Sequence, residues 1–412
     1  MFEDLLKNDI YREVVNFLSE KNLSELSFVV GGTLRDLLLK REIKDIDFAI
    51  KGDTIKLAKE FSKKIEGTFV LLDEHFSIGR IVKGNITIDF SEIRGKSIES
   101  DLMERDFTIN AIAFSIASNK IIDPLNGIGD IEKKKIRMVN EENLKIDPLR
   151  ILRAYRFNST LHFDIENKTR DALRRNAPLL RITAKERIKE EIWKIFATDF
   201  SLKTVELMLD DEIFNSVFKF SEILKPKYNT KALSIIEEVL RKPENIFSNF
   251  KINQPYIKVC LKFAALFGFQ ATQLIRQIKP SKREDRFVEK LIEAEKSLRK
   301  IENLFDKVNF IRQYESIFYP ALIYSMSTDP LATSRLWFYR EMEGFYKRVY
   351  LKNKKKTPLI RGDDLIDMGM EPSPTIGHLL ERVELLTLAG KLSNKEDALE
   401  YIRNYQNLRQ KT

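Results

Sequence analysis

The first 130 residues alternate between short β-branched runs and segments with helical spacing. Each run is bounded by Gly, Asp, Lys or Asn, which is typical of strands. Between the runs, positions 33–40 and 54–65 carry apolar residues at the spacing of a helix. This part of the chain is therefore predicted to form a small sheet with accompanying helices. The predicted strands span residues 28–30, 46–50, 68–72, 78–82 and 86–90.

From residue 147 onward the pattern becomes helical. Nine of the 15 glycines lie before residue 130, and none lies between Gly129 and Gly268. Because glycine is costly inside helices, its absence there favours long helical stretches. We therefore predict an α+β chain, in which a small mixed-sheet head is followed by an elongated, all-helical neck, body and tail. The predicted boundaries are 1–140 for the head, 141–200 for the neck, 201–350 for the body and 351–412 for the tail.

Composition and charge exclude several classes of protein. The 412 residues are 43% hydrophobic, enough for a core, and no apolar run approaches the roughly 18 residues of a membrane-spanning helix. The N-terminal MFEDLLKNDI lacks the apolar region of a secretory signal, so we expect a cytoplasmic protein with no membrane partner. One cysteine and three scattered histidines, His75, His162 and His378, exclude a disulfide scaffold and a zinc site. The net charge of +9 favours a polyanionic partner.

Two glycines and an arginine stand at the start of the first predicted helix, in the stretch FVVGGTLRDLLLKREIKDIDFAI. Gly31 and Gly32 join a predicted strand to that helix, and paired glycines let the backbone approach a phosphate closely. Arg35, in the first helical turn, can reach the same phosphates. Taken alone, a glycine pair before a helix is more often only a tight turn.

Asp45 and Asp47 follow on the next predicted strand, two positions apart, so their side chains share one face. Like charges side by side repel each other, and a pair of Mg²⁺ ions would remove that penalty. One ion would lower the pKa of an attacking hydroxyl and the other would stabilise a leaving pyrophosphate. Asp89, in the alternating run ITIDF, is a third candidate catalytic carboxylate, with a surface acid at a strand end as the alternative.

These residues give the chain a resemblance to a known family. GGTLRD followed by DID is similar to the signature of the DNA polymerase β-like nucleotidyltransferase superfamily. The resemblance covers residues 28–195 and implies a nucleotidyltransferase catalytic head, a neck with a nucleobase-reading helix and a tRNA-binding tail. Four further motifs follow in the order seen in class II tRNA nucleotidyltransferases, the CCA-adding enzyme family: RDFTINAIAF (105–114), IDPLNGIGDI (122–131), DPLRILRAYRF (147–157) and KERIKEEIWKI (185–195).

RDFTINAIAF resembles the family motif that selects a ribonucleotide. The resemblance implies that Arg105 contacts the triphosphate and that Asp106 and Asn110 hydrogen-bond to ribose hydroxyls. Asp106 could also, or instead, cap a helix that starts at Thr108. The family usually has two arginines here, whereas this chain has Glu104 before Arg105.

DPLRILRAYRF resembles the motif that reads the incoming base without a nucleic-acid template. Asp147 and Arg150 are three residues apart and hence on one side of a helix. The carboxylate would accept from the amino group of cytosine or adenine, and the guanidinium would donate to the adjacent ring nitrogen. Uracil and guanine present a carbonyl there, which a buried carboxylate disfavours. Arg153 and Arg156 continue the ridge and could hold phosphate or form the pocket wall.

Simpler structural roles remain open for these last motifs. Asp147 is also a natural helix N-cap, and arginines are common on helix surfaces. In KERIKEEIWKI, Glu186, Arg187 and Glu190 have the spacing of salt bridges along a helix. The family uses this helix to brace the base-reading one, and a solvated helix face explains the segment equally well.

The connector between Asp89 and Arg105 bears on the product. It consists only of FSEIRGKSIESDLME, whereas family members that add the terminal A typically carry a much longer segment here. Its shortness resembles the CC-adding subgroup, which leaves the final A to a separate A-adding enzyme. The expected substrates are tRNA lacking its CCA end, CTP and, for full CCA addition, ATP.

Two other functions are consistent with parts of the sequence. A bacterial-type poly(A) polymerase uses the same head chemistry, and a non-catalytic RNA-binding homologue would keep the fold. Intact Asp45 and Asp47 disfavour the non-catalytic alternative, because a dead copy has no reason to keep adjacent acids. Basic stretches at 279–286 and 352–356 are candidates for contacts with RNA phosphates.

Overall fold

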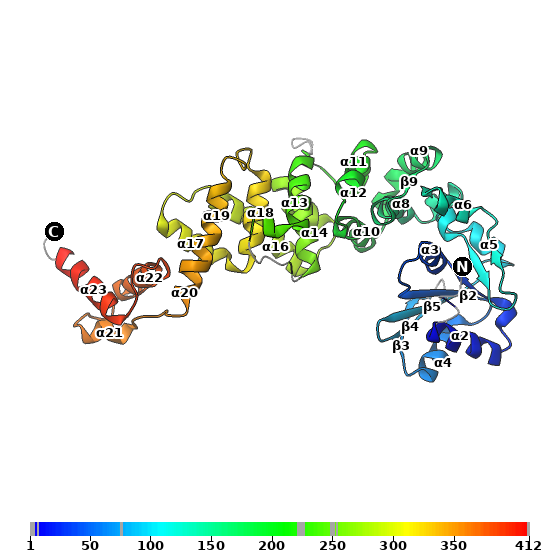
Figure 1. The fold of residues 1–412 in the computed structure, drawn as a ribbon, viewed down its shortest axis with the longest axis horizontal. Helices are drawn as coiled ribbons and strands as arrows, with labels where there is room; N and C mark the ends of the chain where they lie inside the picture. The colour runs from blue at the N-terminus through cyan, green and yellow to red at the C-terminus, as the bar shows by residue number, and fades with distance from the viewer. Residues whose placement is uncertain are drawn as a thin grey trace. The chain divides into compact units, whose positions relative to one another are not determined.

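The computed structural model describes residues 5, 8–74, 77–220, 227–247, 252 and 254–409 (Figure 1). His75 lies outside the described residues. The chain divides into two compact units, one formed by residues 1–195 with 203–217 and the other by 196–202 with 218–412. The finer division into head, neck, body and tail stays a prediction.

A seven-stranded sheet forms the centre of the described head, in the order β3-β4-β5-β2-β1-β6-β7. β2 and β5 run parallel and the other neighbouring strands antiparallel, so the sheet is mixed, as predicted. All five predicted runs are strands, and two shorter strands extend the sheet. The bounds are β1 Ser27–Val30, β2 Asp45–Ile50, β3 Thr68–Asp73, β4 Ile78–Lys83, β5 Ile86–Glu92, β6 Ala113–Ser115 and β7 Ile121–Ile122.

Aromatic side chains join the sheet to two helices, α2 (Asp9–Glu20) and α4 (Thr54–Lys64). The ring centroid of Phe61 on α4 lies 5.8 Å from that of Phe90 on β5, and both rings are fully buried. Figure 1 shows α2 and α4 on one face of the sheet and α3 (Gly32–Leu38) on the other. These rings belong to the core on the α2/α4 face, and a further core cluster contains Val30, Ala49 and Leu102.

The remainder of the first unit is mostly helical. Contrary to the prediction of an all-helical neck, it contains one short strand, β9, which pairs in parallel with β8. The reason is local, because α8 ends at His162 in the left-handed conformation (φ 58°), which turns the chain back towards residues 135–136. The bounds are α5 Ile98–Met103, α6 Gly127–Glu132, β8 Lys135–Ile136, α7 Glu142–Ile146, α8 Leu149–Leu161, β9 Asp164–Ile165, α9 Asn167–Asn176, α10 Lys185–Ala197, α11 Leu202–Asp210 and α12 Ile213–Val217.

The described part of the second unit is helical. A buried ion pair between Lys262 and Glu237, 2.7 Å apart, joins two of its helices, and Ser201 donates to the same carboxylate. None of the described helices is long and apolar enough to cross a membrane. The bounds are α13 Thr230–Arg241, α14 Pro255–Phe267, α15 Ala271–Gln277, α16 Lys282–Leu298, α17 Leu304–Tyr314, α18 Phe318–Thr328, α19 Leu336–Phe345, α20 Leu351–Lys354, α21 Gly362–Asp367, α22 Pro374–Leu388 and α23 Lys395–Arg409.

Candidate active site

The glycine pair brings the turn after β1 against the paired aspartates. Gly31 has φ +68°, a conformation that L side chains rarely adopt, so the turn favours glycine there. An added Cβ on Gly31 would lie 3.5 Å from a carboxylate oxygen of Asp47 and 3.6 Å from a guanidinium nitrogen of Arg105. The turn, the acid and the arginine therefore converge at one point.

Thr33 fixes α3 to the strand that carries the acids. Its hydroxyl accepts a hydrogen bond from the backbone N–H of Asp47 (2.8 Å) and donates to the carbonyl of Asp45 (3.2 Å). Sequence analysis did not single out Thr33. The hydroxyl residue directly after the glycine pair was the signal that could have found it.

A cavity of about 670 Å³ opens at this point, entirely within the first unit. Positively charged side chains outnumber acids along its wall, which suits a polyphosphate. All the predicted site residues line it except Asp89 and Asp147. Those lining it are Gly31, Gly32, Arg35, Asp45, Asp47, Arg105, Asp106, Asn110, Arg150, Arg153 and Arg156, and further basic residues there are Lys44, Arg80, Arg94 and Lys194.

Asp89 lies beside Asp47 on the parallel strand β5, but its carboxylate is engaged by an arginine. Arg80 of β4 donates from Nε and Nη2 to its two oxygens, at 2.8 and 2.7 Å. Arg80 stands directly opposite Asp89 in the antiparallel pairing. A catalytic role for Asp89 stays a prediction, and any such role has to share the carboxylate with Arg80.

The charge of Asp47 is unfavourable in this setting. Burial, helped by the charges of Asp89 and Asp45, raises its pKa from the ordinary 3.8 to about 6, although Arg105 and Arg35 oppose the shift. A bound cation would remove this penalty, and carboxylate oxygens are the ligands that Mg²⁺ prefers. Within the described residues, no group of three or more His, Cys, Asp or Glu side chains is placed to hold a metal ion. The pair therefore fits an ion that completes its shell with phosphates and water, as Mg²⁺ usually does.

We expect Asp47→Asn to stabilise the metal-free protein at neutral pH. Because the pKa in the folded state lies above the ordinary value, the folded protein binds this proton more tightly than the unfolded chain does. The free energy of unfolding therefore falls as the pH rises from about 4 to 6, by at most about 3 kcal/mol, and the Asn variant escapes this loss. In EDTA, its thermal midpoint should exceed that of the native protein at pH 7.5 and approach it at pH 4.5.

Addition of millimolar Mg²⁺ at pH 7.5 serves as the control for this measurement. The ion should raise the thermal midpoint of the native protein more than that of the Asn variant, because only the native protein offers both carboxylates. A native midpoint that Mg²⁺ leaves unmoved would speak against a metal site at this pair.

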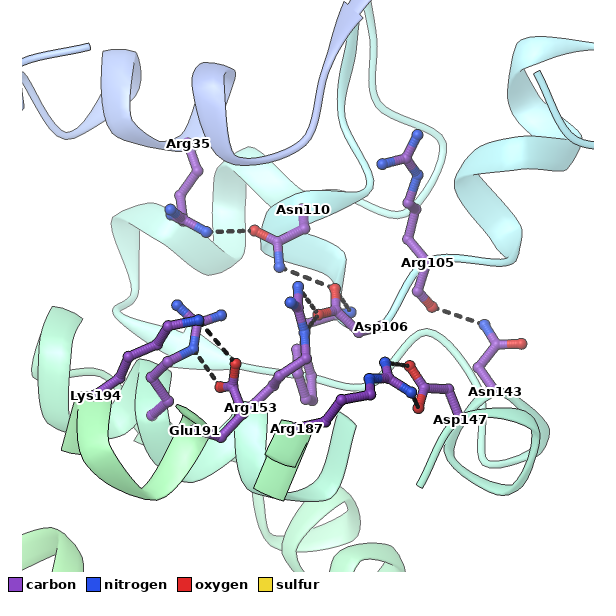
Figure 2. Close-up of polar contacts among 12 residues, drawn as sticks. Arg35, Arg105, Asp106, Asn110, Asn143, Asp147, Arg153, Arg187, Glu191 and Lys194 are labelled. Carbon is purple, nitrogen blue, oxygen red and sulfur yellow. Dashed lines mark hydrogen bonds and ion pairs between the residues drawn. The ribbon is translucent and has the colours of Figure 1, made fainter. Parts of the chain in front are cut away.

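Arg105 is held in place by Asp101 and Asn143. Asp101, a buried residue of α5, accepts from its Nε (2.9 Å) and Nη2 (2.6 Å), and Asn143 donates to its carbonyl oxygen (2.7 Å; Figure 2). Asp101 also accepts from the backbone N–H of Arg94 at 3.1 Å. The guanidinium of Arg105 is thus oriented towards the glycine turn before any ligand arrives.

A chain of hydrogen bonds crosses the cavity wall through Asp106 (Figure 2). Arg35 donates to Asn110 (2.7 Å), Asn110 donates to Asp106 (2.9 Å), and Arg153 donates to the other oxygen of Asp106 (2.7 Å). Burial would raise the pKa of Asp106, but the neighbouring Arg153, the Asn110 bond and Arg150 outweigh it and hold the pKa well below its usual range. Ribose contacts by Asp106 and Asn110 stay a prediction.

The alternative role of Asp106 as a helix cap is wrong. A turn of 3-10 helix does begin at Thr108, but no side chain caps it. Asp106 accepts instead from the adjacent backbone N–H of Phe107, at 2.8 Å.

The neck helix α8 begins at Leu149 and is braced by α10. Asp147 accepts from the backbone N–H of Leu149 (3.3 Å), but the N-cap position belongs to Pro148, so the alternative role of Asp147 as the N-cap is wrong. Asp147 also forms an ion pair with Arg187 of α10 (3.0 Å; Figure 2). One turn further along α10, Glu191 binds Arg156 at 2.6 Å. Glu191 also pairs along α10 with Lys194 (3.3 Å), so this helix forms ion pairs both along its own surface and with neighbouring segments.

Arg150 is the least satisfied group in the cavity. Its Nη1 is buried and has no hydrogen-bond partner among the described residues, and burial lowers the pKa of the guanidinium. Three other arginines surround the ring of Phe157, with guanidinium carbons 4.1 Å (Arg156), 5.0 Å (Arg35) and 5.5 Å (Arg153) from its centroid. Sequence analysis did not single out Phe157. An unpaired buried donor requires an acceptor, and a ligand in the cavity can supply one.

Family models match most of the chain. The model of the poly A polymerase head domain matches residues 27–97 and 88–137, and that of a putative tRNA nucleotidyltransferase domain 2 matches 256–402. Residues 162–224 match a model described as a probable RNA and SrmB-binding site of polymerase A.

Full-length relatives and solved structures agree with these matches. A CC-adding tRNA nucleotidyltransferase of Synechocystis sp. is 30% identical over 392 residues, which cover 90% of this chain and 92% of the relative. A CCA-adding enzyme of Streptococcus pyogenes is 28% identical over 400 residues, with 91% of each chain covered. The Thermotoga maritima CCA-adding enzyme, solved in complex with tRNA, shares the fold at a TM-score of 0.71 and 23% identity, over 97% of this chain and 96% of that one.

A head of this construction places the protein among the nucleotidyltransferases. Within that class, the chain belongs to the tRNA nucleotidyltransferase family of CC-adding and CCA-adding enzymes. The family predicted from the motifs is thereby confirmed, and so is a mixed-sheet head followed by a helical region.

Proposed function

We propose that this protein adds two C residues from CTP to the 3′ end of tRNA that lacks its CCA sequence, and leaves the terminal A to a separate enzyme. The observation that carries nucleotide choice is the unpaired, buried Nη1 of Arg150 in the cavity. The Synechocystis relative named as CC-adding supports the product.

The chain's own residues account for binding and orientation of the triphosphate. Arg105, preset by Asp101, points at the glycine turn where the phosphates would lie, and the arginines around Phe157 add positive charge. Two Mg²⁺ ions, held by Asp45 and Asp47, would when bound activate the 3′-hydroxyl and stabilise the leaving pyrophosphate. The tRNA 3′ oxygen bonds to the α-phosphorus, the bond from that phosphorus to the bridging oxygen breaks, pyrophosphate leaves and the hydroxyl proton passes to water.

Base choice rests on Asp147 and Arg150 together. The free Nη1 of Arg150 supplies the donor for the ring nitrogen, and Asp147 supplies the acceptor for the amino group. In the structure the Asp147 carboxylate accepts a hydrogen bond from Arg187, and Asp147 does not line the cavity. Arg187 holds this carboxylate in place and would share it with a bound base, which makes Arg187 a positioning residue for Asp147.

The structure of the connector supports addition of C alone. Residues 98–103 form the short helix α5, in which Ile98 and Leu102 are buried and Asp101 holds Arg105. A segment committed to these contacts is poorly suited to act as a long flexible lever that would reshape the pocket from C to A.

We expect tRNA ends to stop at CC even when ATP is present. Purified protein is incubated with tRNA lacking CCA and with CTP, ATP or both, and the 3′ ends are sequenced. Ends completed to CCA would overturn the connector argument while leaving the site assignment intact, and long A tails would favour a poly(A) polymerase. Absence of extension under every condition would contradict the enzymatic proposal and favour a non-catalytic RNA-binding protein.

A further inference from the structure

A second cavity, of about 520 Å³, lies within the second unit. It is formed by the start of α14, the first half of α16 and the segment before α18. Four cationic side chains line it, and no acid is among the described residues of its wall. We call this cavity the basic pocket; its cations are Lys282, Arg283, Arg286 and Lys290, all exposed.

Three of these cations form a row along one side of α16. Lys282, Arg286 and Lys290 are spaced four residues apart, so they lie above one another on one side of α16. Asp285 and Glu289, two acids in the same turns of the helix, form ion pairs with Arg276 and not with this row of cations. Within the described part of the chain, the three cations have no ion-pair partner. Like charges at this spacing destabilise a helix, so the row has a cost that a bound anion would offset.

The side chain of the fourth cation, Arg283, is oriented by two uncharged residues. The guanidinium of Arg283 lies over the ring of Tyr256, 4.5 Å from its centroid, and donates a hydrogen bond to the side-chain oxygen of Gln254. Tyr256 is itself fixed edge-to-face against the buried ring of Phe287, at 5.5 Å. Arg283 is therefore oriented without losing its charge, which is the arrangement that lowers the ordering cost of binding an anion.

We propose that the basic pocket binds the phosphodiester backbone of RNA, at a part of the tRNA substrate away from the 3′ end being extended. This inference rests on the proposed function for the choice of RNA. The row of cations extends about 12 Å along α16, at a rise of about 1.5 Å per residue. That length suits successive phosphates of a strand better than a single phosphate group. Contacts from these cations to phosphates carry no base information, so we expect binding that does not depend on sequence.

The test compares two triple variants of the full-length protein with equal loss of charge. The first is Lys282→Ala/Arg286→Ala/Lys290→Ala, and its matched control is Lys231→Ala/Lys242→Ala/Lys300→Ala. The control lysines are exposed, have no ion pair within the described residues and line neither cavity. Affinity for fluorescent tRNA lacking CCA is measured by anisotropy at several salt concentrations without nucleotide, and C addition is measured at saturating tRNA.

We expect the pocket variant to bind tRNA at least tenfold more weakly than the control. Its plot of log affinity against log salt should be shallower by about two, at roughly 0.7–0.9 per lost phosphate contact. The rate of C addition at saturating tRNA should stay within twofold. Equal affinities and slopes for the two variants would overturn the proposal, whether or not either of them adds C.

Two further measurements distinguish RNA binding from a packing effect and from nucleotide binding. A variant with Lys282→Arg/Arg286→Lys/Lys290→Arg keeps the charges and should bind as the native protein does, whereas weak binding by it would point to a packing effect. Titration with CTP alone separates a nucleotide site from an RNA site. If the Ala variant lost a CTP-binding equivalent and kept its tRNA affinity, the pocket would be a nucleotide site and the RNA proposal would be wrong. Absence of C addition by the native protein would contradict the proposed function without affecting the binding comparison.

Discussion

Asp47→Asn should lower the rate of C addition by about 10³-fold while tRNA affinity stays within twofold. Asp47 is the partly buried member of the acidic pair, and its carboxylate faces the glycine turn and the Arg105 guanidinium. Replacement by the isosteric amide removes a charge that the metal would need, and several kcal/mol of transition-state stabilisation are lost with it. Single-turnover extension of tRNA lacking CCA, at saturating CTP and Mg²⁺, measures the effect.

Two matched variants sharpen this experiment. Asp9→Asn removes a charge from a side chain that is 87% exposed on α2, and its rate should equal that of the native protein. Asp89→Asn tests the third carboxylate, which Arg80 engages. A fall as large as that of Asp47→Asn would support direct participation of Asp89, and a fall of about tenfold or less would assign it to positioning through Arg80. A native rate in the Asp47 variant itself would refute the assignment of the pair.

Asp147→Ala should reduce the preference for CTP over UTP by about 10²-fold. The carboxylate accepts from the amino group of cytosine and would face a carbonyl of uracil, so its charge contributes both attraction and rejection. A well-formed pair of base contacts contributes about 1–3 kcal/mol of discrimination. The measurement is kcat/KM for each nucleotide with the same tRNA, and the change should come mainly from a lower value for CTP.

The variant Arg187→Ala distinguishes a residue that contacts the base from one that only positions such a residue. It removes the ion-pair partner of Asp147 and leaves both proposed readers, Asp147 and Arg150, in the chain. We expect a lower kcat/KM for CTP because the carboxylate is held less firmly, with most of the preference over UTP retained. If the preference collapsed in Arg187→Ala and survived in Asp147→Ala, the assignment of the base reader would be wrong.

Local patterns were sufficient for the five longer strands of the head and for most of the predicted residues that line the cavity. Strand alternation placed Asp45 and Asp47 on one face, and the glycine pair marked the turn that meets them. Both signals depend on neighbours a few residues apart, so a single sequence contains them. The ordered motifs then identified the family, because five short matches in one order do not arise by chance.

Pairings between distant segments were beyond the sequence. Arg80 was visible in a predicted strand, but its position opposite Asp89 depends on the register of two antiparallel strands, which no local pattern states. The ion pair between Asp147 and Arg187 joins residues 40 apart in the sequence, and their meeting depends on how α8 and α10 cross.

The sequence by itself determined the strands, the turn, the acidic pair and the arginine-rich neck, since each follows from local sterics, periodicity and charge. Only the tertiary structure decided which of those charges are already satisfied. Asp89, Asp106 and Asp147 have arginine partners, whereas Arg150 keeps a buried donor free. It likewise showed that Asp285 and Glu289 of α16 pair with Arg276 of α15, while the row of cations in the basic pocket has no ion-pair partner among the described residues. Satisfaction of a charge depends on distances of a few ångströms between segments remote in sequence, and these exist only once the chain has folded.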